Sequence, residues 1–202
     1  MQNIYILELI ETPRLIMRFV KPSDAVPINR AIRNTLDLLQ RWQPWAEDSS
    51  LEATKSFIKN AVSTIRLKST GDFPMSIIHK KDQRIIGVCD YNNRSSYSEG
   101  LYEIGYWCDR GYQGKGYITE CVNALSRYAF SVLNAQNILI RMEVENTKSM
   151  AVAQRLNFIR QGKKPSVSHK GAEDYIFLCF NPINLPDLDV NWRHLQGKNL
   201  GK

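Results

Sequence analysis

The sequence predicts a mixed α+β fold, with a mostly antiparallel sheet that contains at least one parallel pair of strands. Apolar residues recur at helical spacing between residues 24 and 68, and from Phe73 the pattern changes to β-branched runs. A strand, a helix and another strand then follow one another between residues 101 and 144. A crossover of this kind joins parallel neighbours in a sheet, so one parallel pair is expected.

The N-terminal third is expected to hold one strand and three helical segments. Residues 14–19 alternate apolar and polar side chains, which is typical of a half-buried strand. Helices are expected over residues 24–33 and 36–41, the second of which ends before Pro44. A longer helix with one apolar stripe begins after Ser50, its expected N-cap, and continues to about Lys68.

The central part of the chain is typical of a β-meander. Residues 73–79 and 84–92 are two strand-like runs joined by a polar turn, which indicates a hairpin, and residues 101–109 form a third run. The remaining expected elements are a helix over 117–133, a strand over 138–144, a short helix over 148–156, and strands over 158–161 and 174–180.

The composition is that of a globular protein. The chain has 202 residues, 43% hydrophobic and 23% charged, which excludes disordered and fibrous classes and favours one domain over residues 1–180. Residues 181–202 hold two prolines and scattered polar residues and are expected to be a loosely ordered tail, with Leu185, Leu188 and Trp192 as docking points. Neither a membrane-spanning run nor a signal peptide is expected, so we predict a cytoplasmic location without membrane contact.

Cysteine, histidine and charge patterns give few functional clues. The four cysteines are far apart in apolar segments, which indicates buried thiols, and no spacing with histidine suggests a metal site. The net charge of +7 favours polyanionic partners such as phosphorylated cofactors or RNA, although a solvated basic surface explains it equally well. No specific DNA binding is expected.

A glycine-rich segment is the first sign of a ligand site. Gly111-Tyr112-Gln113-Gly114-Lys115-Gly116 lies between an expected strand and an expected helix, where free backbone N–H groups and the helix dipole can bind an anion. An ordinary turn is the alternative. The order of residues is neither that of a P-loop nor that of a Rossmann fingerprint, which disfavours adenine dinucleotides.

Several separated motifs together resemble the GNAT acetyltransferase superfamily, and within it the RimJ/RimL branch, which acetylates the N-termini of ribosomal proteins. In chain order these motifs are Glu11-Thr12-Pro13-Arg14-Leu15, Trp42 and Trp45 around Pro44, Glu103-Ile104-Gly105-Tyr106-Trp107, Gln113-Gly114-Lys115-Gly116-Tyr117-Ile118-Thr119-Glu120, Asn146-Thr147-Lys148-Ser149 and Arg155-Leu156-Asn157-Phe158. The resemblance implies the GNAT fold: a twisted sheet whose parallel strands splay apart to admit acetyl-CoA, with helices on both faces.

The resemblance also implies acetyl-CoA as co-substrate and no metal. The family's pyrophosphate motif is matched except at Ile118, where the family has Gly or Ala, and Asn157 replaces a usual glycine in a left-handed turn. The pantetheine arm would lie between the strands around residues 103–108 and 138–144. The residues implied in cofactor binding are Tyr106, Trp107, Cys108, Gln113, Gly114, Lys115, Gly116, Tyr117, Ile118 and Asn146.

Two catalytic roles are implied in the same way. Glu103 matches a position where many GNAT enzymes carry a carboxylate base, the alternative being a surface glutamate. Ser149 matches a position proposed to protonate the leaving thiolate, the alternative being a hydroxyl that bonds the start of a helix. Trp42 and Trp45 would line the acceptor site, or else anchor the core.

The sequence therefore predicts an acetyl-CoA-dependent N-acetyltransferase that acts on a primary amine, with the N-terminal α-amine of a protein such as a ribosomal protein as the expected acceptor. A small amine, namely a polyamine, an amino acid or an aminoglycoside, is an alternative, for which Glu47, Asp48 and Glu52 would supply local acidity. A non-catalytic CoA- or RNA-binding module is another alternative. A basic loop with Lys163, Lys164, His169 and Lys170 would approach RNA or be solvated, so ribosome association stays open.

Overall fold

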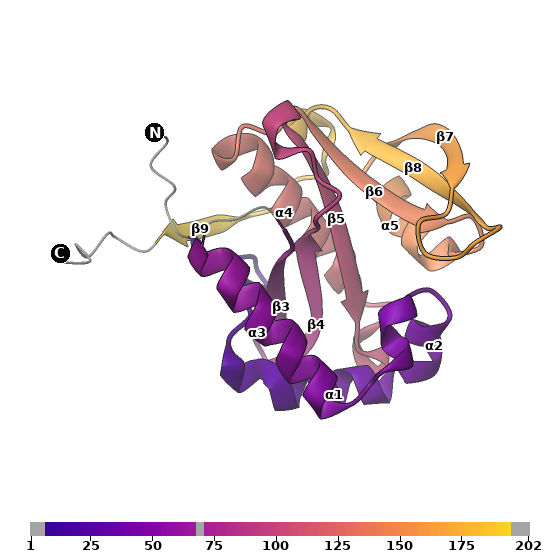
Figure 1. Cartoon of the computed structure of the whole chain (residues 1–202). Coiled ribbons are helices and arrows are strands. Elements are labelled where there is room, and N and C mark those ends of the chain that lie inside the picture. Colours follow the sequence, from indigo (N-terminus) through magenta and orange to yellow (C-terminus); the bar gives the residue numbers. More distant parts are fainter. Residues whose placement is uncertain (1–6, 68–70, 195–202) are drawn as a thin grey trace.

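The computed structural model describes residues 7–67 and 71–194, and Figure 1 shows a sheet with helices packed around it. The strands are β1 (Leu7–Glu11), β2 (Leu15–Phe19), β3 (Phe73–His79), β4 (Arg84–Tyr91), β5 (Leu101–Cys108), β6 (Asn137–Glu143), β7 (Ile159–Pro165), β8 (Glu173–Cys179) and β9 (Asn191–His194). The longer helices are α1 (Ala25–Asn34), α2 (Leu36–Gln40), α3 (Leu51–Leu67), α4 (Tyr117–Val132) and α5 (Thr147–Arg155).

All nine strands belong to one sheet, in the order β7-β8-β6-β5-β4-β3-β2-β1-β9. Among these described strands, β5 and β6 are parallel and the other neighbours are antiparallel. The predicted mixed fold with one parallel pair is confirmed.

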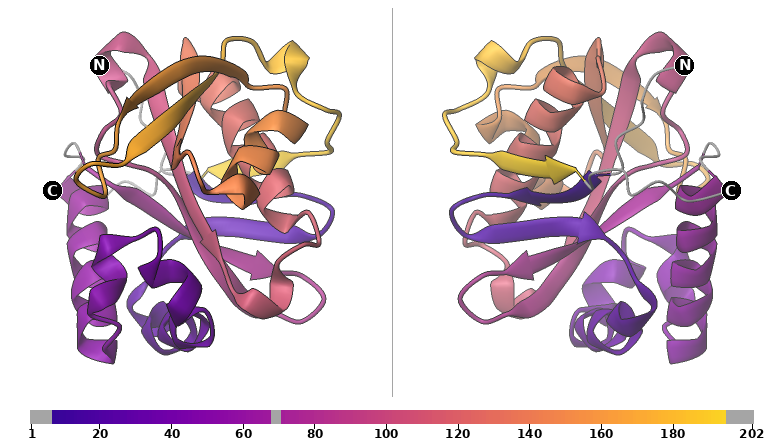
Figure 2. Two further views of the ribbon diagram at one scale, coloured as in Figure 1. Left: turned by 90° about the vertical axis from the view of Figure 1, so that its right-hand side faces the viewer. Right: turned by 90° about the vertical axis from the view of Figure 1, so that its left-hand side faces the viewer.

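Helices cover both faces of the sheet, as Figure 2 shows from two sides. Consecutive residues of β4 illustrate the two layers, because Cys89 belongs to the core under α4 whereas Val88 packs in a second core with α1 and α3. Alternation along a strand places such neighbours on opposite faces. The predicted arrangement of helices on both faces is confirmed.

The parallel pair separates soon after it forms. Residues Leu101 to Glu103 of β5 pair with Asn137 to Leu139 of β6, and from Ile104 onward β5 continues beside β4 whereas β6 continues beside β8. The sheet is thus split in a V from Ile104 onward. This is the opening that the resemblance implied.

The two ends of the described chain meet at one edge of the sheet. The strands β1 and β9 were not expected, yet they pair with each other, and Leu185 is buried while Trp192 packs against Tyr128 with ring centres 5.7 Å apart. The expectation of a loosely ordered tail is wrong through His194, because apolar anchors hold this segment on the core. Residues 195–202, and Lys68 at the expected end of α3, lie outside the described residues.

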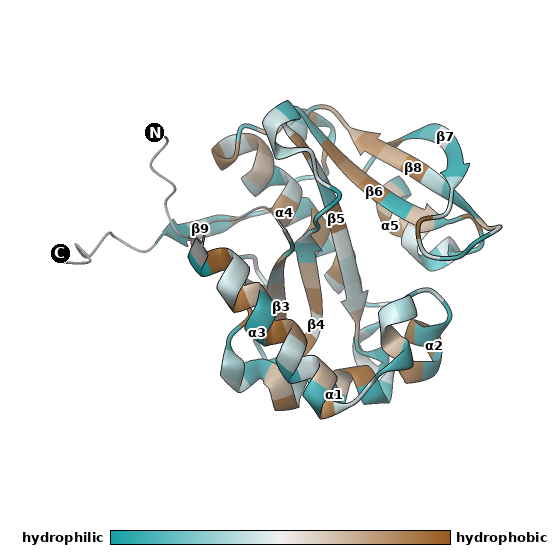
Figure 3. Cartoon of the chain, in the orientation of Figure 1, coloured by the Kyte–Doolittle hydropathy of each residue, from teal (hydrophilic) through white to brown (hydrophobic). Residues whose placement is uncertain are grey.

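The opposite edge strand, β7, is exposed along its whole length and is hydrophilic in Figure 3. Three basic residues of β7 lie on this edge, and charged side chains of this kind discourage pairing with other chains. No helix in the described part of the chain combines the length and apolar character needed to cross a membrane.

Candidate active site

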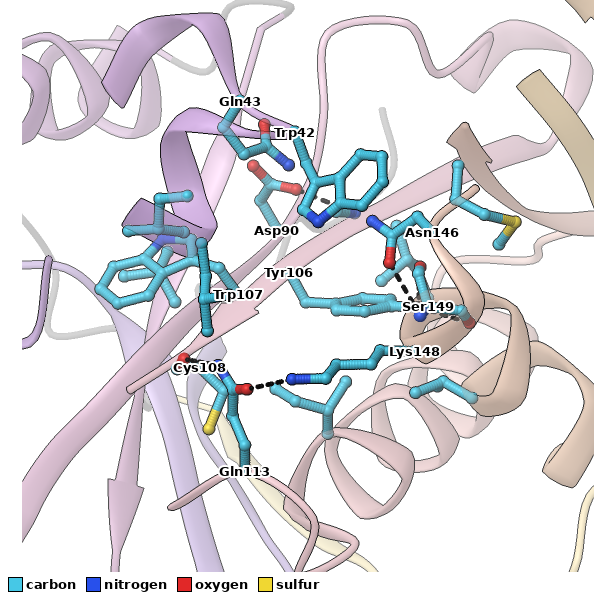
Figure 4. Close-up of a pocket in the computed structure, with 18 of the residues that line it drawn as sticks. Trp42, Gln43, Asp90, Tyr106, Trp107, Cys108, Gln113, Asn146, Lys148 and Ser149 are labelled. Carbon is cyan, nitrogen blue, oxygen red and sulfur yellow. Dashed lines mark hydrogen bonds between the residues drawn. The ribbon is translucent and has the colours of Figure 1, made fainter. Parts of the chain in front are cut away.

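A large cleft of about 1900 Å³ runs through the molecule at the point where β5 and β6 part. Its walls come from β4, β5 and β6, from the segment between α1 and α3, and from the starts of α4 and α5, and Figure 4 shows part of them. One side of β5 faces the core under α4 through Tyr106, and the other faces α1 and α3 through Trp107. We call these the α4 side and the α3 side of the cleft.

The glycine-rich loop forms an anion cradle on the α4 side. Gly114 and Gly116 have φ values of 74° and 79°, which lie in the left-handed region that favours glycine. A Cβ at Gly114 would have no atom within 4 Å, so this backbone is open to a ligand. Since α4 begins at Tyr117, its first N–H groups point out of the helix beside the loop, as pyrophosphate binding requires.

A buried carboxylate holds this loop from behind. Glu120 in the first turn of α4 accepts hydrogen bonds from Thr12 Oγ1 at 2.6 Å and from the backbone N–H of Arg14 at 3.0 Å, and it pairs with Arg14 Nε at 2.5 Å. Arg14 Nη1 in turn donates to the Lys115 carbonyl at 2.9 Å. The sequence predicted no role for Thr12, Arg14 or Glu120, and the available signal was a charged residue on the apolar stripe of α4.

Side chains also connect the loop to the neighbouring elements. Gln113 donates from Nε2 to the Cys108 carbonyl at 3.0 Å and accepts from Lys148 Nζ at 3.1 Å, as Figure 4 shows. The Cys108 side chain is buried, and burial raises the pKa of its thiol to about 12. Cys108 can therefore serve a ligand through its backbone but not as a thiolate.

Two hydroxyl groups meet where β5 faces α5. Tyr106 Oη and Ser149 Oγ are 2.7 Å apart, and burial raises the pKa of Tyr106. Asn146 lines the cleft and caps α5, because its Oδ1 accepts from the Ser149 N–H at 3.1 Å. The roles expected of Ser149 and Asn146 toward substrate stay predictions.

Glu103 lies at the apex of the V, where it is 2% exposed. Its Oε1 accepts from Arg94 Nε at 2.6 Å and from Asn92 Nδ2 at 3.3 Å, and its Oε2 lies 3.7 Å from Arg141 Nε. The alternative of a surface glutamate is wrong, because the side chain is enclosed between two guanidinium groups. Its predicted role as a base is not tested by this arrangement.

A second carboxylate in the cleft, Asp90 of β4, was missed by the sequence analysis. Its Oδ1 accepts from the Gly105 N–H of β5 at 3.0 Å. Burial, followed by the charge of Asp72, raises the pKa of Asp90 to about 7. The available signal was one acidic residue in an otherwise apolar strand.

Aromatic rings form the α3 side of the cleft. Trp42 and Trp45 both line it, and Trp45 is 45% exposed with its ring centre 6.3 Å from that of Trp107. Arg41 lies over the Trp42 ring at 4.6 Å. Both side chains thus face the cleft, and the prediction that they line the acceptor site stays a prediction.

The acidic and basic residues singled out in the sequence differ in where they lie relative to the cleft. Of the three acidic residues near the tryptophans, Asp48 lines the cleft. In the basic segment, Lys163 pairs with Glu173 at 2.8 Å and His169 forms a close pair with Glu143, beside the cleft-lining Ser168. Within residues 7–67 and 71–194, no cluster of acidic, histidine or cysteine side chains is arranged to hold a metal ion.

Comparisons with known proteins agree with this geometry. A protein-family model described as an acetyltransferase (GNAT) domain matches residues 14–159. The ribosomal-protein-serine acetyltransferase of Escherichia coli (strain K12) is 27% identical over 152 residues, covering 71% of this chain and 84% of that protein. The uncharacterized N-acetyltransferase p20 of Bacillus licheniformis is 38% identical over 87 residues, covering 43% of this chain and 48% of that protein.

A solved structure shares the fold. RimL, a ribosomal L7/L12 alpha-N-protein acetyltransferase in complex with coenzyme A, has a TM-score of 0.76 and 21% identity, covering 86% of this chain and 98% of that chain. The split sheet, the anion cradle before α4 and the match of a family model to most of the sequence all agree. The chain therefore belongs to the GNAT family of N-acetyltransferases, whose acetyl donor is acetyl-CoA.

Proposed function

We propose that this protein transfers an acetyl group from acetyl-CoA to the N-terminal α-amine of a protein, with ribosomal proteins as the substrate class. The observation that carries the proposal is the cleft at the split between β5 and β6, which joins an anion cradle on its α4 side to an aromatic wall with carboxylates on its α3 side. The name of the E. coli relative supports the substrate class. Ribosome association and a cytoplasmic location belong to the same proposal.

The donor side follows from backbone chemistry. The N–H groups from Gly114 to Ile118 would bind the pyrophosphate, and the backbone of β5 from Tyr106 to Cys108 would pair with the extended arm as an added strand. Bound acetyl-CoA supplies an activated thioester. The Ser149 hydroxyl would deliver a proton to the departing sulfur, and its contact with Tyr106 supports this proposal.

The acceptor side suits a positively charged amino group at the end of a peptide chain. Asp48, Asp72 and Asp90 bring negative charge to the cleft although the whole protein has a net charge of +7. Trp45 is large and exposed at the wall, where it can pack against the first residues of a peptide. A polyamine would also be attracted by the carboxylates, but it would not need the aromatic wall.

An acceptor screen tests this proposal. The purified protein is incubated with acetyl-CoA and with peptides that copy the N-termini of ribosomal proteins, and thiol release and peptide mass are measured. We expect acetylation at the free α-amine and none of a peptide whose N-terminus is already blocked. Faster acetylation of polyamines or aminoglycosides than of any peptide would refute the proposed acceptor. Binding of CoA without turnover of any amine would favour the binding-module alternative.

The aromatic wall gives a residue-level version of the test. Trp45→Ala should lower kcat/KM for peptides by roughly tenfold, since truncating a large aromatic anchor typically costs more than 1 kcal/mol of binding. The dissociation constant of acetyl-CoA should not change. Trp45→Phe is the matched control and should recover most of the loss, whereas an equal loss in both variants would argue against aromatic packing of the acceptor.

A further inference from the structure

Two carboxylates lie close to the apex of the cleft, and their surroundings differ. Both oxygens of Glu103 face cations, Arg94 at 2.6 Å and Arg141 at 3.7 Å. The Glu103 carboxylate is buried, whereas the Arg94 side chain is 45% exposed, and separating a buried carboxylate from its cations is costly. Glu103 is therefore well suited to hold the apex of the V together.

Asp90 has the opposite surroundings. Its described hydrogen bond is with the Gly105 N–H at 3.0 Å, and the side chain is partly exposed to the cleft. Asp90 lines the same cleft as Trp42 and Gln43, and Figure 4 labels all three. A group that receives a proton from an acceptor has to be reached by it, and this carboxylate meets that condition.

The neighbouring strand is shaped around this carboxylate. A Cβ at position 105 would lie 2.4 Å from Asp90 Oδ1, so a glycine is needed there for the carboxylate to rest against β5. Gly105 is two residues beyond Glu103, the last residue of β5 that pairs with β6. The Asp90 carboxylate thus lies beside the separated part of β5, which pairs with the extended arm of acetyl-CoA in the proposed function.

Charged groups from each side act on Asp90. Asp72, just before β3, and Glu103 of β5 raise the pKa of Asp90, while Arg94, after β4, and the Gly105 N–H lower it. Burial is the largest cause of the rise, which brings the pKa to about 7. On the helical side, Ile28 and Ile32 of α1 and Phe57 of α3 line the cleft without charge, and Asp48 lies between η2 (Pro44–Glu47) and α3. The carboxylate is thus poised to exchange a proton near neutral pH.

We propose that Asp90, rather than Glu103, is the general base that takes the proton of the acceptor ammonium group. This inference rests on the proposed function. The acceptor enters as R–NH3+, and Asp90 takes one proton from it and later passes that proton to solvent through the cleft. The neutral nitrogen attacks the thioester carbon, so a C–N bond forms and the C–S bond breaks. The nitrogen loses a second proton, which balances the proton delivered to the departing sulfur.

The test compares Asp90→Asn with Glu103→Gln in full pH profiles of kcat/KM, with an acceptor that the wild-type protein acetylates. We expect the wild-type profile to rise to a plateau with an inflection near pH 7. Asp90→Asn should lower the plateau by at least about 10²-fold and remove the inflection, because a general base is typically worth that much. Glu103→Gln should retain an inflection, moved to lower pH because this change also removes a like charge that raises the pKa of Asp90, whatever its effect on the plateau.

Two further variants distinguish a base from a structural group. Asp72→Asn should move the inflection to lower pH, since it removes a like charge that raises the pKa of Asp90. Asp48→Asn is the matched control, the same change in a more exposed carboxylate of the cleft, and it should leave the inflection in place. Acetyl-CoA affinity and thermal unfolding verify that each variant is folded.

The outcomes separate the two proposals. If the wild-type protein acetylates no amine, the proposed function fails before Asp90 is tested. If the wild-type protein is active and Asp90→Asn keeps its activity within about threefold, Asp90 is not the base. Loss of the inflection in Glu103→Gln, with its retention in Asp90→Asn, would likewise overturn the inference and support Glu103.

Discussion

In the proposed function, the two sides of the cleft bind their ligands by different means. On the α4 side, the ligand groups would be backbone N–H groups fixed by Gly114, Gly116 and the start of α4. On the α3 side, they would be side chains, mainly Trp45 and Asp90, brought together from separate segments. A backbone site suits a donor that is always the same molecule, whereas a side-chain site can change its specificity by substitution.

The sides also differ in what they contribute to stability. Behind the cradle, Glu120 has hydrogen-bond partners from Thr12 and Arg14, so the donor side is stabilised by its own network. In front of the aromatic wall, Asp90 is held near other acidic groups and has a raised pKa. The acceptor side therefore contains a carboxylate whose ionised form is disfavoured by the fold, as is common at functional sites.

The largest expected effect tests this difference through pH. Burial raises the pKa of Asp90 to about 7 in the folded state, against about 3.9 for an aspartate in water. At pH values between the unfolded and folded pKa, the unfolded chain has released a proton that the folded chain retains. The free energy of unfolding therefore falls as pH rises, and the whole loss of stability is present above pH 7. Three pKa units would correspond to at most about 4 kcal/mol, and since the side chain is partly exposed to the cleft, about 2 kcal/mol is expected.

Asp90→Asn should therefore raise the free energy of unfolding by about 2 kcal/mol at pH 8 and change it little at pH 4. Urea unfolding at both pH values measures this. The variant would gain stability and lose activity. Lower stability at pH 8 would contradict the raised pKa and remove the contrast between the two sides.

A smaller effect is expected from a methyl group on the donor side. Gly116 has a φ of 79°, and a Cβ there would contact Arg14 Nη2 at 3.4 Å. Gly116→Ala should lower the free energy of unfolding or the binding energy of acetyl-CoA by about 1–2 kcal/mol, that is, about tenfold in its dissociation constant. Calorimetric titration with acetyl-CoA, together with urea unfolding, measures both.

Gly111→Ala is the matched control in the same loop. Its Cβ would meet Asp109 Oδ1 at an ordinary 3.4 Å, and its backbone has no left-handed φ. We expect changes within about 0.5 kcal/mol. Equal losses in both variants would mean that added bulk, and not backbone conformation, limits this side.

The same contrast explains what the sequence could predict. The cradle was predictable because glycines at fixed spacing between a strand and a helix produce it locally, and Asn157 adopts the expected left-handed turn with a φ of 57°. The split between β5 and β6 was implied by the resemblance and is present. All of the predicted cofactor-binding residues except Lys115 line the cleft, although contact with acetyl-CoA stays a prediction.

The acceptor side could be predicted only in part. Trp42 and Trp45 stood out by composition, but the surroundings of Asp90 depend on residues far along the chain, such as Asp72 and Glu103, which no local pattern reveals. The strands β1 and β9 were missed for the same reason. Their pairing joins Leu7 to His194, and no local pattern reveals a contact between residues so far apart in the sequence.

The smallest expected effect concerns the contact that joins the two sides. Arg41, just after α2 on the acceptor side, and Glu145, just before α5 on the donor side, form an ion pair at 3.7 Å across the cleft, with side chains 62% and 80% exposed. Exposed pairs of this kind contribute about 0–1 kcal/mol. We therefore expect a coupling energy below about 0.5 kcal/mol in a double-mutant cycle of Arg41→Ala and Glu145→Ala.

The cycle is needed because Arg41 also lies over the Trp42 ring. Arg41→Ala loses that ring contact whether or not Glu145 is present, so the contact cancels when the double variant is compared with the two single variants. Urea unfolding and kcat/KM for a peptide acceptor are measured for the four proteins. A small coupling means that donor and acceptor sides are built independently on one sheet, so that acceptor specificity can change without loss of acetyl-CoA binding. A coupling above about 1 kcal/mol would mean instead that the pair holds the two walls together as one unit, and substitutions on the acceptor side would then alter acetyl-CoA binding as well.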